Sequence, residues 1–126
     1  MKTIQLKIGG RTLALRFDLN AMVAMEETIP DFDISRLSDY VRTPSGLLDM
    51  ILILAREGEE AEGRTLDIDK KWLGRHLTPS PAKIAKVHVV VLDALREGLN
   101  METEDEDEGE VDVVLEEIKK KEEKDD

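Results

Sequence analysis

The side chains that most often carry catalysis or bind metals are few in this chain and widely spaced. The chain has no cysteine, so disulfides, thiolate catalysis and cysteine-based zinc sites are excluded. Its two histidines, His76 and His88, are twelve residues apart and have no carboxylate at the spacing of a metal motif. We expect His88 to be a hydrogen-bonded core residue on the apolar stripe of a helix. We expect His76 to lie near a helix end, where its partial charge suits the helix dipole.

Two further patterns match ligand-binding motifs only in part. Gly9-Gly10 lacks the lysine and the following helix that a phosphate loop requires. Asp67 and Asp69 resemble the start of a calcium loop, but no glycine or terminal glutamate follows at the right offsets. Asp67 is instead expected to cap a short helix. Because no constellation looks catalytic, the sequence predicts a protein that is not an enzyme and that has no cofactor and no metal.

Charge is unevenly distributed along the 126 residues. The chain has 29 acidic and 18 basic residues, a net charge of −11, and residues 102–126 alone hold 14 acids and four bases. This predicts a nearly neutral body, residues 1–101, and an acidic flexible tail, residues 102–126. Because affinity for phosphate comes mainly from Lys and Arg, we expect no nucleic-acid partner. The acidic run at 104–108 keeps mimicry of DNA open as an alternative.

The apolar runs along the chain are short. The longest uncharged one covers residues 50–55, far below the roughly 20 residues of a membrane span. The first five residues lack the continuous apolar stretch of a signal peptide. We therefore expect a soluble intracellular protein whose partners include neither a membrane nor a small molecule.

The predicted fold class is α+β, an N-terminal antiparallel β-hairpin packed on four to five helices. Apolar and polar residues alternate over 4–8 and 13–17, on either side of Gly9-Gly10, and the apolar ones should share one face. Helical spacing then predicts helices at 19–28, 34–41, 44–57 and 81–98 and a short one after Asp67. Good N-terminal caps precede the helices at 19–28, 34–41, 44–57 and 81–98: they are Asp18, Asp33, Thr43 and Ser80.

The helix expected at 44–57 is apolar around most of its circumference, and we expect Gly58 to end it. Such a helix is either the centre of the body, with Leu48 and Leu52 in the core, or is sealed by another subunit. The candidate protein-interaction surface joins residues of this helix to two valines of the last one: Leu47, Met50, Ile53, Leu54, Val89 and Val90. Through it we expect a homo-oligomer, unless a larger helical core absorbs these residues.

The tail contains one apolar pattern and one basic run. Its apolar residues recur at helical spacing and form a candidate tail docking helix: Val111, Val114, Leu115 and Ile118. We expect the tail to be dispensable for folding, with docking of this stripe on the body as the competing hypothesis. Lysine codons are rich in A, so Lys119-Lys120-Lys121 allows a slippery sequence for ribosomal frameshifting.

Residues 8–27 resemble the start of the phage tail assembly chaperones of siphophages and gene transfer agents. The glycine turn leads into Arg16-Phe17-Asp18-Leu19-Asn20-Ala21, and the short helix that follows ends in Glu26-Glu27. The later order is also similar. Pro44-Ser45-Gly46-Leu47-Leu48 opens an apolar helix, an acidic loop and Trp72-Leu73 follow, and the last helix ends in Ala94-Leu95-Arg96-Glu97-Gly98-Leu99.

The resemblance implies a non-enzymatic role in virion assembly. Proteins of this family bind and solubilise the tape measure protein while the tail tube assembles, so the implied partners are the tape measure protein and the tail tube protein. The implied location is the cytoplasm of the bacterial host. The family often makes two products by frameshifting, and this chain would be the upstream one. The alternative belongs to another functional class. It is a small acidic regulatory or adaptor protein, for example a DNA mimic or an antitoxin-like binder.

Overall fold

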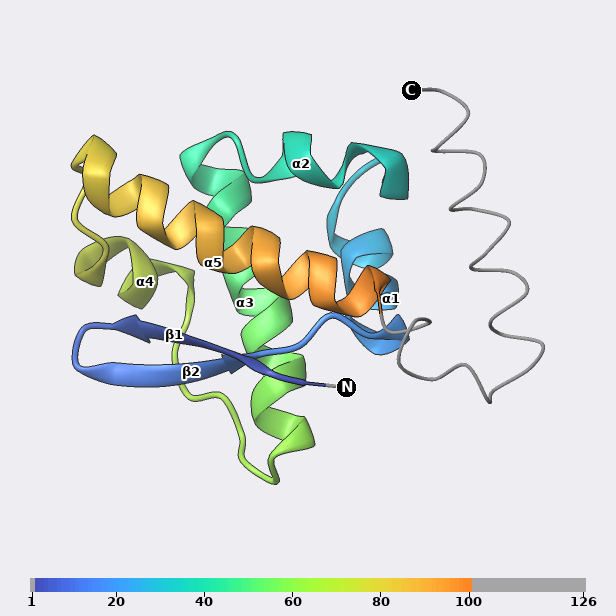
Figure 1. Ribbon diagram of the computed structural model, residues 1–126, viewed down its shortest axis with the longest axis horizontal. Helices are drawn as coiled ribbons and strands as arrows, with labels where there is room; N and C mark the ends of the chain where they lie inside the picture. The colour runs from blue at the N-terminus through green and yellow to red at the C-terminus, as the bar shows by residue number, and fades with distance from the viewer. Residues whose placement is uncertain (1, 101–126) are drawn as a thin grey trace.

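The computed structural model describes residues 2–100 of the chain. The elements follow one another along the chain as β1 (Ile4–Ile8), β2 (Arg11–Leu15), α1 (Leu19–Thr28), η1 (Ile34–Arg36), α2 (Leu37–Tyr40), α3 (Pro44–Ala61), α4 (Lys70–His76) and α5 (Pro81–Leu99). A two-stranded antiparallel hairpin therefore packs with five α-helices (Figure 1). The predicted α+β class is confirmed.

The hairpin turns at Gly9 and Gly10, whose φ angles are 57° and 77°. Glycine adopts such positive angles without steric cost, which is why a two-residue turn can form here. The register pairs Leu6 with Leu13, so apolar side chains of both strands meet on one face. The buried members of that face are Leu6, Ile8, Leu13, Leu15 and Phe17.

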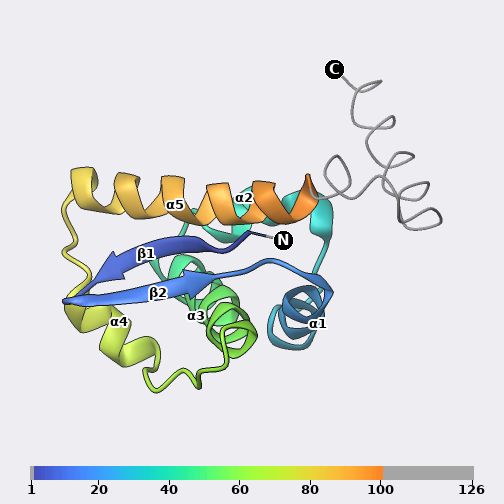
Figure 2. The same ribbon diagram turned by 60° about the horizontal axis from the view of Figure 1, so that its bottom comes forward.

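Helix α3 is the central element of the body. It packs against β2, α1, α4 and α5, while α5 runs alongside β1 on the other side of the hairpin (Figures 1 and 2). Its side chains Met50, Ile51 and Leu54 are fully buried in the single core cluster. Leu48 and Leu52, expected in the core, are only half-buried and pack against its edge.

Gly58 does not end α3, and the prediction that it would is wrong. The helix continues to Ala61, and Gly58 has a packing role inside it. A Cβ atom at Gly58 would lie 1.9 Å from the backbone oxygen of Ala14 in β2. The absence of a side chain thus allows the backbone of α3 to contact the backbone of β2.

Most of the predicted helix caps are confirmed, and one is wrong. Asp18, Asp33, Thr43 and Ser80 each accept a backbone N–H at the start of their helices. Helix α4 is capped by Asp69, whose carboxylate accepts the N–H of Trp72 at 2.8 Å. Asp67 forms an ion pair with Arg11 of β2 instead, and this guanidinium lowers the pKa of Asp67. The cap of α4 is therefore Asp69, two residues later than the sequence predicts.

Candidate binding groove

An open groove with a mainly apolar lining lies between the start of α3, the end of α4 and the start of α5. It encloses about 620 Å³. We call it the apolar groove, and its lining residues are Val41, Arg42, Thr43, Pro44, Leu47, Leu48, Gly74, Leu77, Pro79, Ile84 and His88. Three separate stretches of the chain therefore build one concave surface.

Local sequence signals place each wall of the apolar groove. Thr43 caps α3, and Pro44 occupies its first turn, which fixes the helix start at the mouth of the groove. On α5, Ile84 and His88 are four residues apart and so lie on the same face of the helix. Gly74 of α4 leaves room on the remaining side, since a Cβ there would approach only Leu48 Cδ1, at 3.7 Å.

The polar groups around the apolar groove are few. Arg42 is exposed at the rim and pairs with Asp39 over 3.4 Å. His88 is half-buried, and no hydrogen bond from residues 2–100 reaches its ring. The expectation of a hydrogen-bonded core histidine is therefore wrong. His88 instead lines the apolar groove, together with apolar neighbours.

The other residues considered for chemistry have structural roles in the described part of the chain. His76 is the last residue of α4, as predicted; its ring stacks on Trp72 with centroids 4.0 Å apart, and its Nδ1 lies 2.8 Å from the Trp72 carbonyl oxygen. It also packs beneath the hairpin turn, where a Cβ on Gly9 would meet its ring. Within residues 2–100, no three His, Asp or Glu side chains are grouped as a metal site would need.

The predicted interaction surface is mostly interior, which corrects the expectation from the sequence. Four of its six members are at most 5% exposed in the body: Leu47, Met50, Ile53 and Leu54. They are covered because α3 is surrounded by the hairpin and the other helices, so a larger core absorbs them. Val89 is 56% exposed on α5, and Val90 is half-buried. The tail residues Val111, Val114, Leu115 and Ile118 lie outside the described residues.

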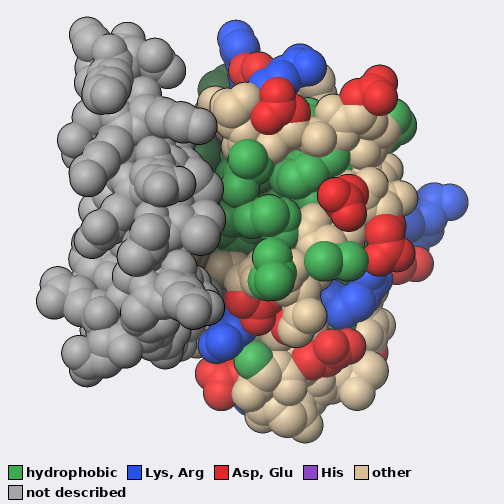
Figure 3. Space-filling model, turned by 90° about the vertical axis from the view of Figure 1, so that its right-hand side faces the viewer, with side chains coloured by type: hydrophobic (Ala, Val, Ile, Leu, Met, Phe, Trp, Pro, Cys, Tyr) green, Lys and Arg blue, Asp and Glu red, His purple; other side chains and the backbone are tan. Residues whose placement is uncertain are grey.

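A second apolar surface lies on α1 and was missed by the sequence reasoning. Leu19 is 72% exposed and Val23 is 45% exposed. They are four residues apart, so both lie on the outer face of α1. Figure 3 shows apolar side chains gathered on the side of the molecule that carries α1. The signal was visible in the sequence, because Leu19 and Val23 extend the apolar stripe of α1 beyond what its buried residues, Ala21 and Met25, require.

Comparison with known proteins gives no relative. No family model matches the chain, and neither a curated protein nor a solved structure matches it. The fold defines a small α+β body with an open, mainly apolar groove. Within residues 2–100, every helix is too short or too polar to cross a membrane.

Proposed function

We propose that this protein is a phage tail assembly chaperone that binds and solubilises apolar segments of the tape measure protein. The observation that supports this most is the apolar groove, an open surface on a body whose core is otherwise well covered. A groove lined by apolar side chains suits an amphipathic helix, which lays its apolar face into such a surface. A long helical client that aggregates by itself is the kind of partner this surface would protect.

The start of the fold agrees with the resemblance drawn from the sequence. The family pattern joins a glycine-turn hairpin to a short helix, and here Asp18 links β2 to α1 by accepting the N–H of Ala21 at 3.0 Å. Arg16 supports that cap through an ion pair with Asp18 at 2.8 Å. We propose accordingly that the protein is not an enzyme, that it acts in the bacterial host cytoplasm and that it also meets the tail tube protein.

The groove can be tested by coexpression with fragments of a phage tape measure protein, whose gene the family resemblance implies to be a neighbour of this one. We expect the wild-type chain to keep such a fragment in the soluble fraction and to copurify with it. Ile84→Glu should abolish both effects, because it places a charge on the groove wall. Ala85→Glu, on the exposed side of the same helix turn, is the matched control and should retain them. Equal solubilisation by both variants would reject the groove as the client site.

Self-association remains a proposal and now depends on Val89, the exposed member of the predicted surface. We propose that copies associate through this face of α5. Light scattering at high micromolar concentration should show oligomers for the wild-type chain and smaller species for Val89→Glu. A wild-type monomer throughout that range would contradict the proposal.

We also propose a longer frameshifted product, with this chain as the upstream one. The support is the run Lys119-Lys120-Lys121, which lies outside the described residues. The nucleotide sequence is the test. An A-rich slippery heptamer between codons 118 and 124 and an overlapping −1 reading frame would support it, and their absence would reject it.

A further inference from the structure

The two edges of the hairpin differ in how their backbone groups are satisfied. In a two-residue hairpin the N–H and C=O groups of every second residue point away from the partner strand. On the β2 side two outward N–H groups have partners in α3: Ala14 donates to the Glu59 carboxylate at 2.9 Å, and Arg16, just past the end of β2, donates to the Leu54 carbonyl at 3.0 Å. The outward N–H of Thr12, near the turn, has no partner within residues 2–100. On β1 the corresponding groups belong to Gln5 and Lys7, and no residue within 2–100 hydrogen-bonds to them.

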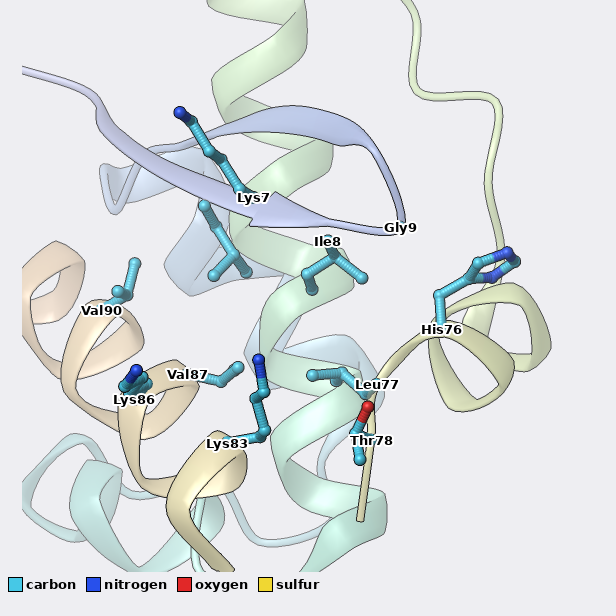
Figure 4. A pocket seen from close by; sticks show the side chains of 11 residues that line it. Lys7, Ile8, Gly9, His76, Leu77, Thr78, Lys83, Lys86, Val87 and Val90 are labelled. Carbon is cyan, nitrogen blue, oxygen red and sulfur yellow. The ribbon is translucent and has the colours of Figure 1, made fainter. Parts of the chain in front are cut away.

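A hollow of about 330 Å³ lies beside this open edge, between β1, the end of α4 and α5 (Figure 4). We call it the lysine groove. Its apolar floor is formed by side chains from all three walls, and Figure 4 shows Ile8, Leu77 and Val87 directed toward the hollow. Other lining residues are Leu6, Lys7, Gly9, His76, Thr78, Lys83, Lys86 and Val90.

Two lysines of α5, Lys83 and Lys86, give the lysine groove its charge. Lys7 of β1 also lines it, but its side chain extends from the opposite face of the strand to Ile8 (Figure 4). No carboxylate within residues 2–100 forms an ion pair with any of these lysines, although seven other ion pairs occur in that part of the chain. An open sheet edge, an apolar floor and unpaired cations together suit an extended peptide that is apolar on one side and acidic on the other.

We propose that residues 110–117 of this chain's own tail dock in the lysine groove as a third strand paired with β1. In an extended segment alternate side chains face opposite ways, so Val111, Val113 and Leu115 share one side and fit the apolar floor. Asp112 and Glu116 lie on the other side and complement the lysines. The run of valines also favours a strand. This inference is independent of the proposed client and of the apolar groove.

The length of the connecting segment allows the docking. Helix α5 ends at Leu99, and the lysine groove faces its Lys83–Val90 part, roughly 14–24 Å back along the helix axis at 1.5 Å per residue. Residues 101–110 can span about 33 Å when extended. The tail of the same chain therefore reaches the groove, and its covalent attachment gives it an effective concentration on the order of millimolar.

Amide hydrogen exchange of Gln5 and Lys7, measured by NMR on the full chain, tests the proposal. Both amides should be protected in the wild-type chain, because pairing with a third strand engages them. Val113→Asp should accelerate their exchange on the order of tenfold, whereas Val114→Asp, on the opposite side of the strand, should not. If Val114→Asp removes the protection and Val113→Asp does not, a helix docks there instead and the strand assignment is overturned. Unprotected amides in the wild-type chain overturn the docking itself.

The charge contribution is tested separately. The double variant Lys83→Glu/Lys86→Glu should lose the protection, and adding Asp112→Lys/Glu116→Lys should restore it. Lys71→Glu, an exposed lysine of α4 outside the groove, is the control and should change nothing. The protection should be the same at low and high protein concentration; if it increases with concentration, the occupant is a second copy and the intramolecular assignment is wrong.

Discussion

The carboxylate of Glu59 accepts the backbone N–H of Ala14 at 2.9 Å, which joins the last turns of α3 to the outer edge of β2. Glu59 is only 7% exposed, and Arg64 holds it from the other side with N–O distances of 2.9 and 3.0 Å. A buried charge is stable only when it is paired and hydrogen-bonded, and here both conditions are met. This glutamate therefore fixes the sheet edge to the central helix.

Replacing Glu59 should destabilise the body. In Glu59→Ala the Ala14 N–H loses its acceptor at a buried position, which costs about 1–3 kcal/mol. Urea unfolding followed by circular dichroism measures the change in the free energy of unfolding. Glu60→Ala removes an exposed neighbouring carboxylate and should stay within about 0.5 kcal/mol of wild type. Equal stabilities for the two variants would show that Glu59 does not secure the edge.

The same contact should make stability depend on pH. The Arg64 guanidinium, chiefly by hydrogen bonding, lowers the pKa of Glu59 below its usual 4.5. A carboxyl whose pKa is lowered by folding stabilises the protein fully above its unfolded pKa and loses that contribution as the pH falls through the folded value. The stability difference between wild type and Glu59→Gln should therefore be constant near neutrality and shrink below pH 4.5. A difference that stays constant down to pH 3 would contradict this.

Gly58→Ala should be far more harmful than an ordinary glycine-to-alanine change in a helix. The new methyl group would overlap the Ala14 oxygen, so α3 and β2 must separate, and overpacking of this kind costs about 1–3 kcal/mol. Gly74→Ala in α4 is the matched control. Its Cβ has space, so the gain in helix propensity should stabilise the protein by about 0.5–1 kcal/mol. Opposite shifts in thermal midpoint are the expected result.

The contrast between core and surface leucines is a further test. Leu54 is fully buried in α3, and Leu54→Ala should cost about 2–5 kcal/mol. Leu19 is 72% exposed on α1, so Leu19→Ala should change the free energy of unfolding by no more than about 0.5 kcal/mol. Denaturant unfolding of both variants gives the comparison, and a large loss for Leu19→Ala would show that the apolar face of α1 is covered in solution.

Features set by local sequence could be predicted. The two glycines and the alternation around them specify the hairpin, and the caps with their following prolines specify where α3 and α5 begin. Asp67 and Asp69 show the limit of such reasoning. Both are good capping residues, and the choice between them depends on Arg11, which comes from β2 and engages Asp67.

Features set by several elements together could not be predicted. The sequence shows that α3 is apolar on most sides, but only the packing of the hairpin and four helices decides that Leu47 and Ile53 are covered. The apolar groove has the same origin, since Leu48, Gly74 and Ile84 come from three helices. By local sequence alone Gly58 predicts a helix end, because its packing partner, Ala14, is distant in sequence.

The position of β1 against α5 has a consequence for how the chain acquires its fold during synthesis. The hairpin emerges from the ribosome first, whereas α5, which lies alongside it, is translated roughly 70 residues later, a delay on the order of 4–14 s. Through that interval the apolar face formed by Leu6 and Leu13 lacks its final cover. The nascent chain therefore depends on late, long-range closure, which slows folding and lengthens the time in which its strands are open to aggregation.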